Sequence, residues 1–407
     1  MVNISGATIL SLHRRQNMRH VMKTYGRKEI SFVRGEGIWL FDSNGKKYLD
    51  ALCGIAVTGL GHCHPSVVEA VSEQSKTLMH ASNLYNIPEQ EKLATELAKI
   101  SQMDAMFFCN SGAEANEVAI KLARLYGHKR GAEKPNIIVM EQSFHGRTMA
   151  TLSATGNRKV QAGFEPLLGG FSRVPFDDID AVRAVGENNP DTVAILVEPV
   201  QGEGGIRIPR PTYLEELRDV CVKNNWLLMV DEVQSGMGRT GSWFAHQQTG
   251  IIPDVMTLAK GLGNGIPIGA CLAKGEAAEI LTPGTHGSTF GGNPVASRAA
   301  LATIQAIAKE SLLENAKRQG DLITKRLKEA FDGNSSVVNI RNKGLMIGVE
   351  LNESCGQIVD LALESGLLLN VTADKVVRLL PPLILTDNDS EVMAGMVATV
   401  IKKFLSK

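Results

Sequence analysis

The sequence has no excess charge of either sign and no long apolar run, and each absence excludes a class of function. The 407-residue chain carries 43 Lys and Arg against 43 Asp and Glu, so its formal net charge is zero. A nucleic-acid-binding protein would normally carry a basic excess or a basic stripe, so we expect no nucleic-acid partner. Because no apolar run approaches the roughly 18 residues of a membrane span, we also expect no membrane insertion.

Secretion signals and paired cysteines are also missing. Residues 1–16 contain a basic pair but no apolar stretch followed by a small-residue cleavage site, so we expect no signal peptide. The six cysteines are scattered without a CxxC pair, which is typical of reduced thiols in a cytoplasmic protein. The segment His62-Cys63-His64-Pro65 is a poor metal site, because adjacent positions of an extended segment point to opposite faces. We expect a cytoplasmic protein without a metal centre.

Short apolar runs alternate with helical patterns through the middle of the chain. Glu114–Tyr126 carries apolar residues at helical spacing, and Thr212-Tyr213-Leu214-Glu215 resembles a capping box that opens a helix with Leu214, Leu217 and Cys221 on one face. Short buried strands that alternate with helices indicate a mostly parallel sheet in a three-layer α/β domain. The predicted strands are Ala105–Cys109, Asn136–Met140, Ala194–Val197, Trp226–Val230, Val255–Ala259 and Gly269–Ala273.

The two ends of the chain follow other patterns. Turn signals between short alternating runs suggest hairpins in Phe32–Leu49. The C-terminal third predicts a long helical stretch at about Pro294–Phe331, then strands, then a final helix. We predict that residues 1–60 contribute to a small α+β domain, that 61–295 form the large domain, and that 296–407 complete the small one. The late strands are predicted at Val337–Arg341, Met346–Leu351 and Val376–Leu380, and the final helix places Val392, Met396, Val400 and Phe404 on one face.

Two candidate ligand-binding groups lie at the ends of predicted strands, where open α/β sheets bind ligands. Ser111, Gly112 and Ala113 follow a strand and open a helix, whose free N–H groups and positive dipole end suit a phosphate. A simple helix N-cap is the alternative there. Asp231 follows the predicted strand Trp226–Val230, where a carboxylate serves equally for a metal, a ribose hydroxyl, a protonated ring nitrogen or a structural salt bridge.

Lys260 and the segment Ser143–Arg147 supply further chemistry. Lys260 ends an apolar strand and enters a glycine-rich turn, where burial would lower the pKa of its amine and make it nucleophilic. A surface lysine in a loop is the alternative. Phe144 and His145 are equally compatible with structural roles, whereas the guanidinium of Arg147 can bind a carboxylate bidentately.

Taken together, a phosphate cradle, a lysine for a Schiff base, a carboxylate for a pyridinium nitrogen and an aromatic face describe a pyridoxal phosphate site. The chain resembles the class-III aminotransferases of the fold-type-I pyridoxal phosphate enzymes, from about residue 20 to the C-terminus. Ala113 departs from the family pattern, because many members have Thr there, and this removes at most one side-chain contact to phosphate. The matching segments are Gly61–Pro65, Asn110–Glu117, Phe144–Arg147, Glu198–Gly205, Asp231–Gly241 and His286–Pro294.

The resemblance implies a role for each matching residue. Lys260 would hold the cofactor and move the reacting proton, and Asp231 would keep the pyridinium nitrogen protonated. Thr289 would reach the phosphate of the partner subunit, so the resemblance implies a homodimer with shared active sites. The remaining cofactor contacts would come from Ser111, Gly112, Ala113, Phe144, Glu232, Val233 and Gln234.

Substrate recognition is likewise implied by the resemblance. Arg147 and Ser288 would bind substrate, and Arg378 would take the α-carboxylate of glutamate once Glu203 swings away. Within the class the chain most resembles members that act on N2-acetylornithine and 2-oxoglutarate in arginine biosynthesis, through the segments Gly54–Pro65, Ser82–Tyr85 and His286–Phe290.

Three other interpretations compete with this one. Sister enzymes of the class accept ornithine, succinylornithine, N-succinyl-diaminopimelate or 4-aminobutyrate, and their cofactor machinery would be identical. A catalytically silent homologue could lose Lys260 freely, yet the lysine is present. A nicotinamide-dependent dehydrogenase is disfavoured because Gly261–Gly269 lacks the GxGxxG spacing.

Overall fold

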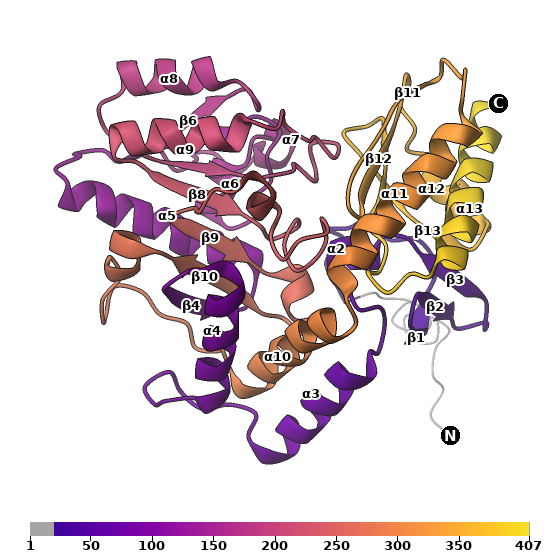
Figure 1. Cartoon of the computed structure of the whole chain (residues 1–407), viewed down its shortest axis with the longest axis horizontal. Helices are drawn as coiled ribbons and strands as arrows, with labels where there is room; N and C mark the ends of the chain where they lie inside the picture. The colour runs from indigo at the N-terminus through magenta and orange to yellow at the C-terminus, as the bar shows by residue number, and fades with distance from the viewer. Residues whose placement is uncertain (1–19, 407) are drawn as a thin grey trace, which may run out of the picture.

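The structure is a computed structural model that describes residues 20–406 (Figure 1). The segment 1–16, for which no signal peptide is expected, lies outside the described residues. Within the described part of the chain, the largest sheet has seven strands in the order β4-β10-β9-β8-β7-β5-β6. The strands are β4 (Ala105–Cys109), β5 (Asn136–Met140), β6 (Phe171–Val174), β7 (Thr192–Val197), β8 (Leu227–Asp231), β9 (Val255–Leu258) and β10 (Gly269–Ala273).

The predicted α/β class with a mostly parallel sheet is confirmed. Strands β6, β5, β7, β8 and β9 pair in parallel, and β10 runs antiparallel to both β9 and β4. The apolar runs are buried on both faces because helices cover both sides of the sheet. Along β5, Ile137 and Val139 pack toward α5 (Gly112–Lys129), whereas Ile138 and Met140 pack toward α8 (Ile179–Asn188) and α9 (Tyr213–Asn224).

Two smaller sheets lie beside this body (Figure 1). One is antiparallel, in the order β11-β12-β15-β14, and α11 and α13 pack near it. The other joins the predicted N-terminal hairpins to a late strand, because β13 pairs in parallel with β3. The bounds are β1 (Phe32–Glu36), β2 (Trp39–Asp42), β3 (Lys47–Asp50), β11 (Val337–Lys343), β12 (Met346–Leu351), β13 (Leu367–Leu368), β14 (Asn370–Thr372) and β15 (Val376–Leu379).

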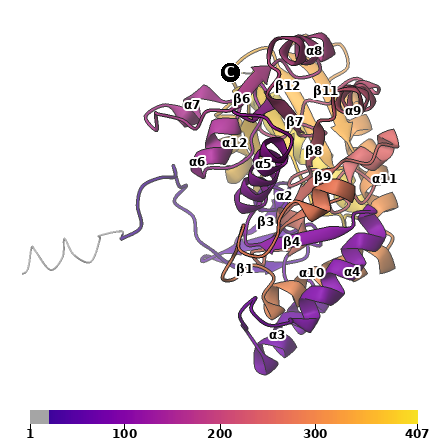
Figure 2. The same ribbon diagram turned by 90° about the vertical axis from the view of Figure 1, so that its left-hand side faces the viewer.

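Helices from distant parts of the sequence lie side by side below the large sheet. Figures 1 and 2 both show α3 and α4 against α10, and these helices are in contact. The limits at residues 60 and 295 stay a prediction. The remaining helices are α2 (Cys53–Ala56), α3 (Pro65–Thr77), α4 (Pro88–Ser101), α6 (Met149–Ala154), α7 (Arg158–Gln161), α10 (Pro294–Lys309), α11 (Leu312–Ala330), α12 (Ile358–Glu364) and α13 (Asp387–Leu405).

Three local predictions were wrong. The Thr212 hydroxyl does not cap α9 but donates to the Glu216 carboxylate over 2.8 Å, although the predicted buried face of that helix is confirmed. The stretch expected at about Pro294–Phe331 is two helices, because Ser311 adopts a left-handed backbone with φ 53° and ends the run. The buried face of α13 was also misplaced.

The error in α13 has a simple geometric cause. Steps of four residues drift around a helix of 3.6 residues per turn, so the predicted set does not stay on one face. Val392 is 44% exposed, whereas Met393, Val397 and Ile401 are fully buried. Among the described residues, no helix is both long and apolar enough to cross a membrane.

Candidate active site

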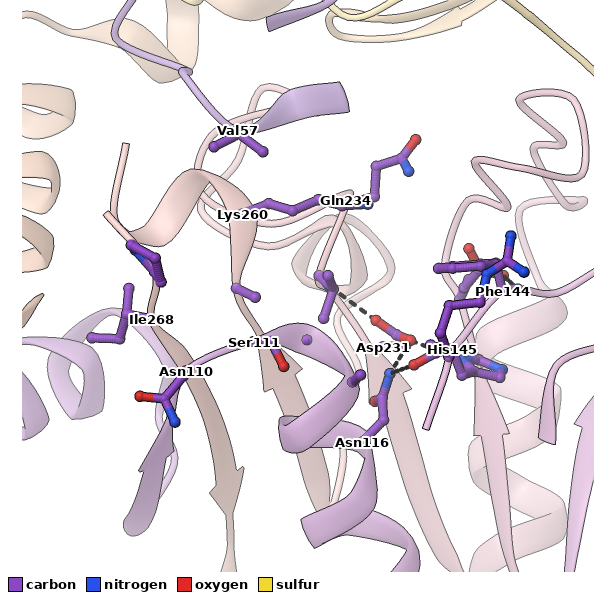
Figure 3. A pocket seen from close by; sticks show the side chains of 18 of the residues that line it. Val57, Asn110, Ser111, Asn116, Phe144, His145, Asp231, Gln234, Lys260 and Ile268 are labelled. Carbon is purple, nitrogen blue, oxygen red and sulfur yellow. Dashed lines mark hydrogen bonds and ion pairs between the residues drawn. The ribbon is translucent and has the colours of Figure 1, made fainter. Parts of the chain in front are cut away.

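A cavity of about 420 Å³ lies at the carboxyl ends of the central strands (Figure 3). Loops that follow parallel strands meet at one edge of the sheet, so residues far apart in the sequence line a common wall. Most residues predicted for the site are brought together here: Ser111, Gly112, Ala113, Phe144, Arg147, Glu203, Asp231, Val233, Gln234 and Lys260.

Lys260 stands two residues after the end of β9 and is half-buried in the cavity wall. Burial lowers the pKa of its amine below the ordinary lysine value, against the opposing charge of Glu203 and with a contribution from the positive charge of Arg378. A lowered pKa increases the share of neutral amine, which is the nucleophilic form. The buried-lysine interpretation is therefore favoured over a surface lysine.

Asp231 ends β8 and is enclosed by hydrogen-bond donors. Its Oδ2 accepts from His145 Nδ1 over 2.7 Å and from Asn116 Nδ2 over 2.8 Å, while Oδ1 accepts from the Val233 N–H over 3.0 Å (Figure 3). Thr257 Oγ1 in turn donates to Asn116 Oδ1 over 2.8 Å, which fixes the orientation of that amide. The carboxylate is therefore held in one place by partners from three separate elements.

Asn116 and His145 are functional residues that the sequence-based reasoning missed. Asn116 lies in the segment Asn110–Glu117, which carries the family resemblance, but no role was predicted for it. His145 was interpreted as compatible with a structural role. A signal was available for Asn116, because it is a polar residue on the buried face of α5 between Ala115 and Ala119. A buried polar side chain needs a partner, and here the partner is Asp231.

The turn before α5 combines the two interpretations proposed for it. Ser111 is the N-cap of α5, since its Oγ accepts from the Glu114 N–H over 3.1 Å. Its own hydroxyl proton is still available to a ligand. A Cβ on Gly112 would lie only 2.7 Å from Val233 Cγ1, so glycine allows this turn to approach the loop after β8. The turn thus presents a hydroxyl and free N–H groups beside Asp231.

Glu203 lines the cavity and forms an ion pair with Arg378, which lies outside the lining. Arg378 Nη1 donates to Glu203 Oε1 over 2.6 Å and to Gln234 Oε1 over 3.3 Å. The arginine side chain is 0% exposed and the glutamate side chain 34% exposed, so only the glutamate has access to solvent. Burial alone would raise the pKa of Glu203, but the charge and hydrogen bond of Arg378 hold that pKa below its ordinary value.

Glu198 is a second residue of the cavity wall without a role assigned from the sequence. Its carboxyl accepts from the Phe144 N–H over 3.1 Å and from the Gly202 N–H over 3.4 Å. Burial raises the pKa of Glu198 to about 7, and the nearby charge of Asp231 contributes to the rise while His145 opposes it. Glu198 therefore links the loop that carries the aromatic ring to the loop that carries Glu203.

Besides Arg378, three predicted residues lie outside the cavity lining, namely Glu232, Ser288 and Thr289, whereas Arg147 belongs to it. The Glu232 carboxylate accepts from His246 Nδ1 over 2.9 Å and from Ser235 Oγ over 2.5 Å, away from the cavity, so we do not retain it as a cofactor contact. Arg147 is exposed, with its guanidinium carbon 5.6 Å from the centre of the Phe144 ring. Ser288 Oγ accepts from Asn110 Nδ2 over 3.4 Å at the margin, and Thr289 is exposed.

The cavity fits a ligand with a phosphate, an aromatic ring and a ring nitrogen. The turn at Ser111 suits the phosphate, Phe144 supplies an aromatic face, and the buried Asp231 carboxylate suits a protonated nitrogen. Lys260 supplies an amine with a lowered pKa in the same wall. Pyridoxal phosphate has all three parts and an aldehyde that reacts with an amine.

Comparison with known proteins agrees with this fit. Residues 21–401 match the family model described as Aminotransferase class-III. The chain is 57% identical to an acetylornithine aminotransferase from Nitrosomonas europaea over 388 residues, which cover 95% of this chain and 99% of that protein. It is 47% identical to an acetylornithine aminotransferase from Methanocaldococcus jannaschii, covering 95% of this chain and 97% of the other.

Solved structures share the fold over nearly the whole chain. An ornithine aminotransferase from Toxoplasma gondii, with pyridoxal phosphate partly occupying its active site, superimposes with a TM-score of 0.91 at 29% identity, covering 99% of this chain and 96% of that one. An N-acetylornithine aminotransferase from Stenotrophomonas maltophilia gives a TM-score of 0.81 at 35% identity, covering 94% and 98% of the two chains.

Proposed function

Because the chain belongs to the class-III aminotransferase family, we propose that it transfers the δ-amino group of N2-acetylornithine to 2-oxoglutarate. The products are N-acetylglutamate 5-semialdehyde and glutamate, and the reaction belongs to arginine biosynthesis. The enzyme is a pyridoxal-phosphate-dependent transaminase. The observation that carries the use of glutamate is the ion pair between Arg378 and Glu203, because Glu203 lines the same cavity as Lys260. The choice of N2-acetylornithine is supported by the similar acetylornithine aminotransferases.

When bound, pyridoxal phosphate supplies an electron sink for the carbanion that forms at the substrate carbon. Lys260 would hold it through Nζ, the turn at Ser111–Ala113 would hold its phosphate, and Asp231 would face its ring nitrogen. Phe144 would stack on the ring, and Gln234 would reach its hydroxyl.

Lys260 and Asp231 are the two residues with proposed catalytic roles. Nζ of Lys260 would take the proton from the substrate carbon that bears the amine and would deliver it to the carbon of the cofactor that receives the amino group. The lowered pKa of Lys260 favours the neutral amine that takes the proton. The Asp231 carboxylate would keep a proton on the ring nitrogen, and each pKa unit of that preference would be worth about 1.4 kcal/mol. His145 and Asn116 hold this carboxylate in place.

Two arginines account for the two different substrates. N2-acetylornithine carries one carboxylate, distant from its reacting amine, and Arg147, which lines the cavity, would bind it. Glutamate has a second carboxylate next to the reacting carbon, which Arg378 would bind after the half-exposed Glu203 side chain moves away. Ser288, at the cavity margin, would add a substrate contact.

A homodimer in the cytoplasm is the second part of the proposal. Met79, Leu84, Tyr85 and Phe290 expose between 61% and 87% of their surface. Their two segments lie together, because Asn83 Nδ2 donates to Ser288 O over 2.9 Å. A second copy of the chain covering this apolar patch would bring Thr289 toward a neighbouring active site. The six free thiols suit the cytoplasm. A monomeric mass by light scattering would contradict the dimer.

The experiment that tests the substrate is a half-reaction screen with the cofactor-loaded enzyme. N2-acetylornithine, ornithine, succinylornithine, N-succinyl-diaminopimelate and 4-aminobutyrate are offered one at a time, and the loss of the cofactor's visible absorbance is followed. We expect the highest kcat/KM with N2-acetylornithine. A higher value with any other amine overturns the assignment of substrate and leaves the transaminase assignment in place.

A further inference from the structure

The short edge strand β14 contacts both members of the Glu203–Arg378 pair. It pairs antiparallel with β15 in a register that puts Asn370 opposite Arg378. Asn370 Oδ1 accepts from Arg378 Nε over 3.0 Å, and Thr372 Oγ1 donates to the backbone carbonyl of Glu203. Residues two apart on a strand share a face, so one strand holds the arginine side chain and the glutamate backbone.

The backbone around Glu203 is further fixed from the same sheet. Arg341 donates from Nε to Ile206 O over 2.8 Å and from Nη2 to Gly205 O. The backbone carbonyls of Glu203, Gly205 and Ile206 are thus all held by hydrogen bonds. Glu203 can therefore leave Arg378 only by rotation of its side chain. Its 34% exposure gives that rotation a path toward solvent.

Arg378 retains neutral partners when the Glu203 carboxylate leaves. Its Nε bonds to Asn370 and its Nη1 to Gln234, and both acceptors are amide oxygens. Because a guanidinium only donates, the atom of Asn370 that faces Nε is the oxygen. Buried Nη2 has no hydrogen-bond partner within residues 20–406. Two neutral acceptors thus orient the guanidinium without cancelling its charge, and unused donors remain for a ligand.

We propose that Asn370 is a positioning residue that determines dicarboxylate specificity. Its neutral amide keeps Arg378 oriented in both halves of the reaction, and leaves the positive charge available to the α-carboxylate of glutamate or 2-oxoglutarate. A carboxylate at this place would orient Arg378 equally well and would neutralise it permanently. The inference rests on the proposed function, since it assumes a substrate with two carboxylates.

The decisive variant is Asn370→Asp, which keeps the shape and the acceptor and adds one charge beside Nε. We expect kcat/KM for the glutamate half-reaction to fall roughly 100-fold, mainly through KM, with the N2-acetylornithine half-reaction within about threefold of its starting value. Asn370→Ala removes the acceptor without adding charge and should lower the glutamate value by roughly tenfold. The matched control is Asn339→Asp at an exposed position of β11 in the same sheet, which should leave both halves unchanged.

A double variant separates a charge effect from a loss of shape. Glu203→Gln alone leaves Arg378 without a counter-charge and should weaken the N2-acetylornithine half-reaction by roughly tenfold. Adding Asn370→Asp supplies a fixed counter-charge, so the double variant should regain that half-reaction while the glutamate half stays impaired. A purely structural role for Asn370 predicts no such rescue.

Calorimetric binding of glutarate to the loaded enzyme gives a readout independent of turnover. We expect Asn370→Asp to weaken glutarate binding by about the same factor as the glutamate half-reaction. Equal losses in both half-reactions, or unchanged glutarate binding, would overturn the role of Asn370. If the aspartate variant does not fold, the same measurements on Asn370→Ala decide the role. If the parent enzyme does not react with N2-acetylornithine, the proposed function fails, while the glutamate and glutarate measurements still decide the role of Asn370.

Discussion

Two charged groups of the site differ in their surroundings: Asp231, which lines the cavity, and Arg378, which is buried beside the lining residue Glu203. Asp231 accepts from His145, Asn116 and a backbone N–H, all fixed within the large sheet and its helices. Arg378 has one half-exposed acidic partner and an Nη2 without a partner among the described residues. A charge needed unchanged in both half-reactions is enclosed by rigid partners. A charge that must meet two different substrates keeps free donors and a movable counter-ion.

The largest effect should come from Lys260, which experiences both charges. Lys260→Ala removes the amine that would hold the cofactor and move the proton, so both half-reactions should fall by at least ~10⁴-fold. Turnover and the cofactor's absorbance measure the loss. Lys260→Arg keeps a cation at the same place without a usable nucleophile and should be equally inactive. Full turnover in either variant would show that the lysine has another role.

Replacing Asp231 tests the charged group whose hydrogen-bond partners are fixed. Asp231→Asn keeps the size of the side chain but cannot hold a proton on the ring nitrogen by charge. We expect both half-reactions to fall roughly 10³-fold and by similar factors, since the electron sink serves both. Single-turnover rates with each substrate are the measurement. A loss confined to one half-reaction would mean that Asp231 acts on the substrate.

Replacing Arg378 tests the charged group whose counter-ion, Glu203, can move. Arg378→Ala should impair the glutamate half-reaction about 100-fold more than the N2-acetylornithine half-reaction, because only glutamate needs a partner for an α-carboxylate. The two kcat/KM values measured with the same preparation decide the outcome. Equal losses in both halves would disprove the switch between Glu203 and the substrate.

The smallest effect on turnover is expected at Glu198, whose carboxyl accepts from the backbone N–H groups of Phe144 and Gly202. Its pKa of about 7 means that the folded protein keeps a proton that an unfolded glutamate loses near its reference value of 4.5. The folded state therefore binds more protons in this window, and the free energy of unfolding falls as pH rises through it. Glu198→Gln removes that fall, which amounts to about 3 kcal/mol over 2.5 pH units.

Thermal unfolding at pH 5 and at pH 7.5 measures this difference. The melting temperature of Glu198→Gln relative to the parent should rise by a few degrees between the two pH values, with turnover changed less than about tenfold. Glu187→Gln, at an exposed position of α8, is the control and should show no such trend. A constant difference at both pH values would mean that Glu198 is ionised throughout.

The elements predicted best from the sequence were the buried strands. Asn136–Met140 and Gly269–Ala273 match β5 and β10 to the residue, because continuous apolar runs between turn signals have few other interpretations. Helix ends were predicted less well. Thr212 bonds to the Glu216 carboxylate instead of capping its helix, and a local motif does not reveal which acceptor its hydroxyl will choose.

Some residues of the candidate site were predicted from the sequence, and others were not. Residues at or just after the ends of strands, such as Asp231 and Lys260, were predicted to meet because parallel strands deliver their ends to one edge. Asn116 and Asn370 act through other side chains, and their partners lie 115 and eight positions away in the sequence. The helical pattern marks Asn116 as a polar residue on a buried face but does not name its partner, and Asn370 has no pattern of its own. Both partners follow from the pairing of elements that only the folded chain brings together.

Lys260 also has a backbone conformation with a consequence for stability. Its φ of 41° lies in the left-handed region, which costs a residue with a side chain roughly 1 kcal/mol and costs glycine almost nothing. The same residue has an amine whose charged form is disfavoured by burial. The residue proposed to react with the cofactor therefore lowers the stability of the folded protein through both its backbone and its side chain. Selection of cofactor-free protein for heat resistance alone would favour loss of this lysine, so activity has to be part of any such selection.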